Sequence, residues 1–231
     1  MIDEAQTVTD WDGFYQSMKY HGKTVSFLCS KNMPSRRLLF LSATLDDINL
    51  DKLLRKFYLT PENIYSISAP SIRHHLVLAG RSFLSNVMRD RVERIERWIR
   101  SEFPNDMVLI YVTFRYEAEI IARGLTKKGI PTEYYHGGMG SCEREMIQRM
   151  FHQSCFQCIV CTEAFGLGID QPQVRGVRVE GGARDVGTAV QVSGRVRPIQ
   201  GQIAKALFSL CPSTLIREFV LIADDVQRVD R

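Results

Sequence analysis

The sequence lacks any uninterrupted apolar run long enough to cross a membrane, although 45% of its 231 residues are hydrophobic. A spanning helix needs roughly 18 or more such residues, so we expect no transmembrane helix and no membrane partner. The N-terminus also lacks a basic segment followed by an apolar core, and carries Asp3, Glu4 and Asp10 instead. This argues against a secretory signal peptide. With no repeat or low-complexity tract, the composition is that of a globular protein.

A large excess of charge of one sign is missing as well. The sequence has 30 Lys and Arg residues and 26 Asp and Glu residues, which gives a net charge of +4. This balance permits contact with nucleic acid without requiring it. The Arg-rich stretch 89–100 is interpreted as the solvated face of a helix rather than as a groove for DNA.

Six cysteines are present, and three of them, Cys155, Cys158 and Cys161, fall in "CFQCIVC". Their spacing leaves a zinc site as one alternative. However, "FQCIVCT" is apolar and β-branched and is typical of a buried strand. Residues three apart in a strand point to opposite faces, so Cys158 and Cys161 are poorly placed to share one metal. We therefore favour buried, reduced cysteines and expect no zinc in this chain.

Strand-like apolar runs alternate with stretches of helical periodicity along the chain. The predicted strands lie at 37–44, 63–68, 74–80, 106–113, 132–137, 156–162, 174–181 and 203–210. The predicted helices lie at 46–58, 85–103, 117–129, 141–151 and about 187–194. This alternation predicts an α/β fold with a parallel sheet that helices cover on both faces. Ser, Ala and Pro residues at 66–75 predict a linker.

Polar residues follow the predicted strands in a regular series. Ligands of parallel α/β sheets bind at the carboxyl ends of the strands, so this series marks one edge of the sheet as a binding surface. A strand end often carries Gly, Ser or Asp for structural reasons alone, but that explanation fits the whole ordered series poorly. The residues are Asp3, Glu4, Ser42, Thr44, Thr113, Arg115, His136, Thr162, Gly168, Asp170, Gln191, Gly194 and Arg195.

The order of the motifs resembles a known family. "DEAQ" at 3–6, "SAT" at 42–44, "AFGLGID" at 164–170 and "QVSGR" at 191–195 are similar to motifs II, III, V and VI of superfamily 2 helicases. "YHGGMGSCEREMIQRMF" followed by "IVCTEAFGLGIDQPQVRGV" resembles the RecQ branch in particular. The resemblance covers about residues 2–201. It implies a partial RecA-like, ATP-binding domain at 1–70 and a second RecA-like domain, the helicase C-terminal domain, at 71–231.

The resemblance implies ATP and Mg²⁺ as cofactors, with ATP in the cleft between two RecA-like domains. Asp3 would hold the metal, as a carboxylate suits a hard cation, and Glu4 would orient the attacking water. Several other residues take roles by the same resemblance. Gln6 would relay the nucleotide state to the other domain, and Ser42 and Thr44 would couple the two domains. Gly168 and Asp170 would approach the nucleotide. Gln191 and Arg195 would line the second wall of the ATP cleft.

The resemblance also implies single-stranded or forked DNA as partner, and a place in DNA repair and recombination in the nucleus or a nucleoid. Single-strand binding uses cations for phosphates and aromatic faces for bases. Trp11, Phe14 and Tyr15 are candidates for stacking on bases or for sensing the strand. For Phe14 and Tyr15, burial in the core is the alternative. The implied phosphate contacts are Thr113, Arg115, His136 and Thr162.

Three departures from the family pattern stand out. No Walker A loop is present, because the only Gly-Lys-Thr, at 22–24, has Ser17 where the pattern needs glycine. In the last motif Pro198 replaces an arginine, and Arg197 stands one position early. That arginine is worth about a thousandfold or more in rate in comparable enzymes. Beyond Cys211 no four-cysteine zinc module follows.

These departures leave two readings of function. The first is a RecQ-like, ATP-dependent 3′→5′ DNA helicase in fragment form, running from motif II through motif VI and inactive as this chain alone. The alternative is a non-catalytic module, derived from a helicase, that binds nucleic acid or a protein partner. An incomplete gene prediction, a decayed gene copy or a selected segment would each give such a chain.

Overall fold

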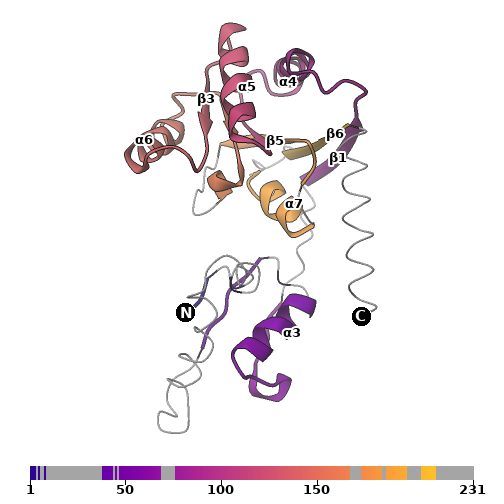
Figure 1. The fold of residues 1–231 in the computed structure, drawn as a ribbon, viewed down its shortest axis with the longest axis vertical. Helices are drawn as coiled ribbons and strands as arrows, with labels where there is room; N and C mark the ends of the chain where they lie inside the picture. The colour runs from indigo at the N-terminus through magenta and orange to yellow at the C-terminus, as the bar shows by residue number, and fades with distance from the viewer. Residues whose placement is uncertain are drawn as a thin grey trace. The chain divides into compact units, whose positions relative to one another are not determined.

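The computed structural model describes residues 1–3, 5, 8, 38–43, 45, 47–68, 76–166, 173–183, 186–196 and 204–211. The chain divides into two compact units, Met1–Ile72 and Arg73–Arg231 (Figure 1). Each unit has its own buried apolar cluster. Within the described residues, no helix is both long and apolar enough for a membrane span.

Unit 1 contains the helix α3 (Asp47–Lys56) and the 3-10 helix η1 (Pro61–Asn63). The apolar periodicity of 46–58 predicts a stripe of Leu50, Leu53, Leu54 and Phe57. Leu53, Leu54 and Phe57 are buried, and Leu50 is half-buried. Phe57 packs edge-on against the ring of Phe40, with centroids 5.0 Å apart. These contacts form a small core that α3 shares with the first residues of the chain.

Two strand predictions in unit 1 need correction. In the described part of 37–44, the pairing is one isolated parallel bridge between Ile2 and Phe40. The prediction of a strand at 63–68 is wrong, because Asn63 ends η1 and residues 64–68 are irregular. Tyr65 and Ile67 are exposed there. Their alternation with polar residues resembles that of a strand, but among the described residues no strand pairs with this segment.

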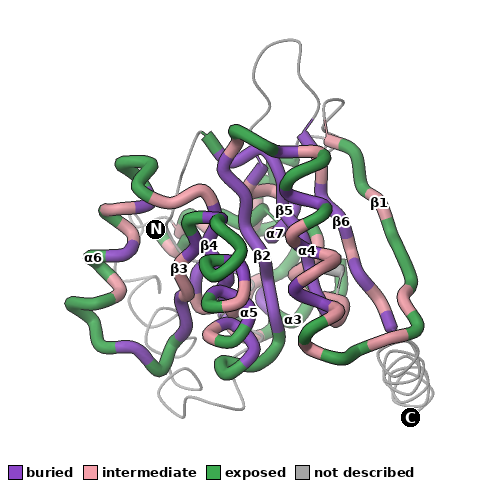
Figure 2. The backbone as a smooth tube through the Cα atoms, turned by 90° about the horizontal axis from the view of Figure 1, so that it is seen from above, coloured by how far each residue is buried: buried purple, intermediate pink, exposed green. Residues whose placement is uncertain are grey.

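Unit 2 is built on a parallel sheet of six strands in the order β1-β6-β5-β2-β4-β3. All five neighbouring pairs are parallel, which confirms the predicted sheet. The strands are β1 (Leu76–Ser82), β2 (Met107–Val112), β3 (Thr132–Tyr135), β4 (Cys158–Cys161), β5 (Val174–Glu180) and β6 (Ala204–Leu210). Figure 2 shows β2 buried along its length near the middle of the sheet, whereas the edge strand β1 is largely exposed.

Helices cover both faces of this sheet, as predicted. They are α4 (Met88–Glu102), α5 (Arg115–Lys127), α6 (Ser141–His152) and α7 (Val186–Ser193), with the short η2 (Glu163–Gly166). Alternate residues of β2 enter different cores, since Ile110 packs with α4 and α5 whereas Leu109 packs with α6 and α7. This two-sided burial explains the continuous apolar run in β2.

The cysteines of β4 lie as the strand periodicity predicts. Cys158 belongs to the core under α4 and α5, and Cys161 belongs to the core on the opposite face. Burial raises the pKa of both thiols well above the ordinary range. Among the described residues, no three His, Cys, Asp or Glu side chains gather closely enough to hold a metal ion.

Candidate functional site

The predicted phosphate contacts of unit 2 meet at one edge of the sheet, because all of its strands run in the same direction. Thr113 follows β2, His136 follows β3 and Thr162 follows β4. We call this the carboxyl edge, defined by Thr113, His136, Thr162 and Gly181, which follows β5. The Thr162 amide donates to the Tyr135 carbonyl at 3.1 Å and so joins the ends of β3 and β4.

Thr113 lies beside the backbone of Gly181. A Cβ atom added to Gly181 would lie 3.4 Å from Thr113 Oγ1, and the glycine has a left-handed φ of +96°. A side chain at this position would therefore be strained and would crowd the threonine hydroxyl. The turn after β5 leaves Thr113 exposed to solvent.

Arg115, the first residue of α5, reaches the turn that follows β3. A Cβ atom on Gly138 would lie 3.1 Å from Arg115 Nη1 and 3.3 Å from His136 Nδ1. Arg115 and His136 therefore flank the same glycine, so the structure brings together two residues predicted from separate motifs. The Arg115 side chain is exposed, and it places a permanent positive charge at the carboxyl edge.

His136 is only 7% exposed, and both of its ring nitrogens are engaged within the protein. Nδ1 accepts from the Gly138 amide at 3.2 Å, and Nε2 lies 3.3 Å from Glu119 Oε1 on α5. The ring also stacks on Tyr134, with centroids 5.6 Å apart. In this arrangement His136 fixes the Gly138 turn, and its predicted contact with phosphate stays a prediction.

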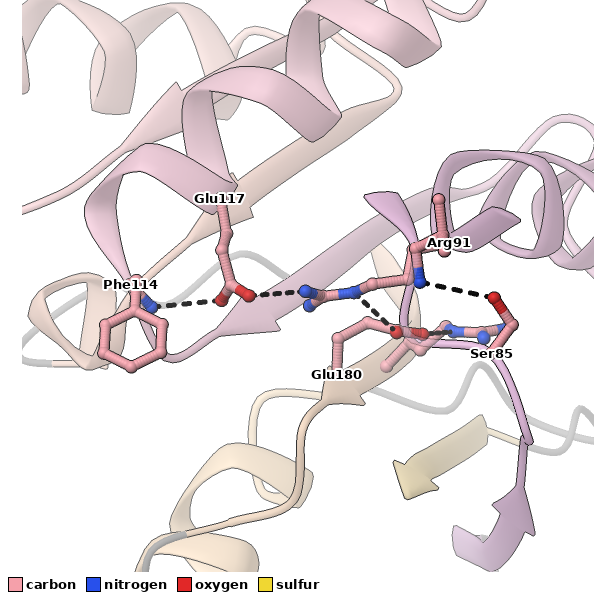
Figure 3. A network of polar contacts seen from close by, with 7 residues as sticks. Ser85, Arg91, Phe114, Glu117 and Glu180 are labelled. Atoms are coloured by element: carbon pink, nitrogen blue, oxygen red, sulfur yellow. Dashed lines mark hydrogen bonds and ion pairs between the residues drawn. The ribbon is translucent and has the colours of Figure 1, made fainter. Parts of the chain in front are cut away.

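A buried ion pair lies at the beginning of α5. Arg91 of α4 donates from Nη1 to Glu117 Oε1, and the two residues are 3% and 7% exposed (Figure 3). The other carboxylate oxygen of Glu117 accepts from the Phe114 amide at 3.2 Å. Glu117 thus caps the first turn of its own helix, as a glutamate at the third helical position does in a capping box. Phe114, whose amide this contact holds, lies between Thr113 and Arg115 in the chain.

The same network continues into β5. Glu180 accepts from Arg91 Nε at 3.4 Å and from Arg178 Nε at 2.6 Å. Burial lowers the pKa of the Arg178 guanidinium, an effect that the adjacent Glu180 opposes. Two arginines and two glutamates are therefore buried together with compensating charge. Removal of any one member would leave a buried charge without its partner, which strongly destabilises a fold.

The interpretation of the charged residues of 89–100 as a solvated face is wrong for Arg91, which is 3% exposed. Arg91 stands one helical turn before Ile95, on the stripe that α4 buries. That spacing could have marked it as a buried charge in need of a partner. Its partners Glu117 and Glu180 are 26 and 89 residues away along the sequence, and no local pattern connects them.

Gln191 and Arg195 lie at the end of α7, and both are half-buried. Burial raises the pKa of the Tyr111 hydroxyl, and the nearby positive charge of Arg195 opposes this shift. The same charge acts on Cys161, the last residue of β4. Arg195 therefore lies near the carboxyl ends of β2 and β4, at the edge where the polar series meets.

In unit 1 the structure brings Asp3 and Ser42 to the same end of the Ile2–Phe40 bridge. The Ile2 amide donates to Leu39 O at 2.8 Å, and the Leu41 amide donates to Ile2 O at 2.9 Å. Asp3 and Ser42 follow directly, and both are exposed. The other predicted site residues lie outside the described residues: Glu4, Gln6, Trp11, Thr44, Gly168 and Asp170.

Comparison with known proteins identifies a helicase domain within the chain. Residues 90–198 match the model of the helicase conserved C-terminal domain. The chain is 29% identical over 197 residues to the ATP-dependent DNA helicase RecQ of Pasteurella multocida, and 30% identical over 198 residues to the RecQ-like DNA helicase BLM of Xenopus laevis. Both alignments cover 84% of this chain, but 29% and 14% of those proteins. The chain thus spans less than a third of either relative.

Solved structures show the same fold. Saccharomyces cerevisiae Dbp5, bound to RNA and ADP BeF3, aligns with a TM-score of 0.71 at 18% identity, over 96% of this chain and 55% of that one. Mss116p, bound to ssRNA and AMP-PNP, aligns with a TM-score of 0.66 at 20% identity, over 91% of this chain and 42% of that one. At these identities the likeness concerns the fold alone. Residues 90–198 are a helicase conserved C-terminal domain, and the chain is a distant homologue of RecQ helicases.

Proposed function

We propose that this chain is part of a RecQ-like, ATP-dependent helicase that moves 3′→5′ along single-stranded DNA and separates the duplex. The observation that carries the proposal is the carboxyl edge of unit 2, where Arg115 and Thr113 are exposed together on a helicase C-terminal domain. The names of the RecQ relatives support DNA as the substrate. A DNA substrate implies the nucleus or a nucleoid as the location, and a role in repair or recombination.

The carboxyl edge suits the phosphate backbone of one DNA strand. Arg115 offers a planar guanidinium with several donors, and Thr113 adds a hydroxyl beside it. Gly138 and Gly181 carry no side chain at the points where Arg115 and Thr113 pack. Backbone contacts of this kind do not read the sequence of bases. We therefore expect binding that depends on salt and varies little with base sequence.

The residues predicted to hold ATP and Mg²⁺ fit that chemistry where the structure describes them. Asp3 is an exposed carboxylate beside Ser42, which suits a hydrated Mg²⁺ ion. Arg195 brings a positive charge to the carboxyl ends of β2 and β4, which suits a nucleotide phosphate. When bound, MgATP supplies the γ-phosphoryl group whose hydrolysis drives movement. These 231 residues contain no Walker A loop and have Pro198 in the last motif, so we expect slow or no turnover by this chain alone.

The first test measures ATP turnover by the purified chain with and without single-stranded DNA, and a Glu4→Gln variant is the control. The second test measures DNA binding by fluorescence anisotropy. We expect salt-sensitive DNA binding and turnover at the level of the control. DNA-stimulated turnover that Glu4→Gln abolishes would contradict the proposed inactivity of the isolated chain. Absence of DNA binding would contradict the proposed function of the carboxyl edge and favour a module that binds a protein partner.

A further inference from the structure

Two aromatic rings stand in solvent at the carboxyl edge, and the function proposed above does not use them. Phe114 is 51% exposed and Tyr116 is 57% exposed. Their rings stack on one another, with centroids 5.6 Å apart and an interplanar angle of 13°. Side chains of this size are normally buried, so a stacked and exposed pair marks a surface available for binding.

The pair alternates with the proposed phosphate contacts along the chain. Thr113 and Arg115 are the residues that precede and separate the two rings, and both are exposed. A nucleotide carries an anionic phosphate and a flat base. The segment 113–116 therefore presents a hydroxyl, a cation and two aromatic faces within four consecutive residues. This is the combination that single-strand binding sites use.

The backbone at Phe114 is also held in place before any ligand binds. The Phe114 amide donates to Glu117 Oε2 at 3.2 Å, and Glu117 is paired with the buried Arg91. Phe114 O accepts from the amides of Glu117 and Ala118 at 3.2 and 3.3 Å. A fixed backbone and mutual stacking reduce the entropy lost when a ligand binds.

We propose that Phe114 and Tyr116 form a stacking surface for a base of single-stranded DNA, whose phosphates contact Arg115 and Thr113. This inference rests on the proposed function, which it deepens by naming residues that contact bases. Every base has a π face, so the surface tolerates any sequence. A protein partner that covers the rings is the competing occupant, and the experiment below separates the two.

The test uses the whole chain, oligothymidine, and an abasic strand of the same length that has phosphates but no bases. We expect the double variant Phe114→Ala/Tyr116→Ala to bind oligothymidine about tenfold more weakly, the order of effect of losing one stacked base. The same variant should bind the abasic strand as the unaltered chain does. Tyr116→Phe keeps the ring and should retain the affinity. Tyr65→Ala removes another highly exposed ring, in unit 1, and is the matched control.

The outcomes distinguish failure of the stacking surface from failure of the proposed function on which it rests. Unchanged binding of oligothymidine by the double variant would overturn the stacking surface and leave the phosphate contacts standing. Equal weakening on both strands would also overturn it, because the rings would then act on the backbone or on the fold. If the unaltered chain binds neither strand, the proposed function fails and the stacking surface fails with it.

Discussion

Arg91 of α4 and Glu117 of α5 form a buried ion pair, and the same glutamate holds the Phe114 amide at the start of α5. Side chains of three elements thus form one network that holds the backbone at Phe114, since Glu180 of β5 also accepts from Arg91. The structural role of this arginine can be separated from binding, because Arg91 itself is 3% exposed.

Replacing Arg91 by alanine should destabilise the chain by about 3–5 kcal/mol, because Glu117 and Glu180 would then lose a buried partner. Urea unfolding followed by circular dichroism measures this change. Arg89→Ala is the matched control on the same helix. Arg89 pairs with Glu93 at 3.2 Å, but its side chain is 86% exposed, so its loss should cost about 1 kcal/mol or less. Similar losses for both variants would show that the buried network contributes little.

Gly176 of β5 should not tolerate a side chain. A Cβ atom there would lie 2.7 Å from Phe103 Cε2, and that ring is buried edge-on against Trp98. We expect Gly176→Ala to cost about 1–3 kcal/mol through overpacking. Gly80→Ala in β1 is the control, because nothing lies within 4 Å of its added Cβ. The prediction fails if the two variants unfold at the same urea concentration.

Cysteine reactivity should follow burial. In the native chain iodoacetamide should label Cys142 and Cys155, which are exposed, and spare Cys158, Cys161 and Cys211, which are buried. The thiolate is the reactive form, and burial raises the pKa of Cys158 and Cys161. Peptide mapping by mass spectrometry reads the labels, and the same reaction in denaturant should modify all six cysteines of the sequence. Rapid native labelling of Cys158 would contradict the buried strand β4.

Glu133 should make the chain less stable as the pH rises. Burial raises the pKa of its carboxyl, and the negative charge of Glu143 raises it further. The folded state therefore holds this proton more tightly than the unfolded state, so stability falls as the pH rises through the folded pKa. Glu133→Gln should raise the melting temperature at neutral pH, and the gain should disappear below the unfolded pKa of about 4.3. A gain that is independent of pH would contradict the assignment.

Much of unit 2 could be predicted from the sequence because its elements have clear periodicity. The strand 106–113 and the helix 117–129 fall close to β2 and α5, since two-sided burial and an apolar stripe leave local signals. Residues 63–68 show where local periodicity fails to predict a strand. Their alternation predicted a strand, but a strand also needs a neighbour, which a local pattern does not reveal.

The candidate site could likewise be predicted only in part from the sequence. Thr113, Arg115 and His136 could be found because each follows a recognisable strand. The buried network that holds the Phe114 amide could not, because Arg91, Glu117 and Glu180 come together only when α4, α5 and β5 pack. Phe114 and Tyr116 gave no signal either, because exposure of a ring is a property of the fold.

The measurement that tests the central claim most directly is the salt dependence of oligothymidine binding by the chain and by Arg115→Ala. The control is Arg123→Ala, which removes another largely exposed arginine of α5. If Arg115 contacts a phosphate, its loss should weaken binding and reduce the slope of log affinity against log salt by about 0.7, the share of one phosphate contact on a single strand. Arg123→Ala should leave the slope unchanged. An unchanged slope for Arg115→Ala, in a chain that still binds DNA, would contradict the assignment of the carboxyl edge as the DNA-binding surface.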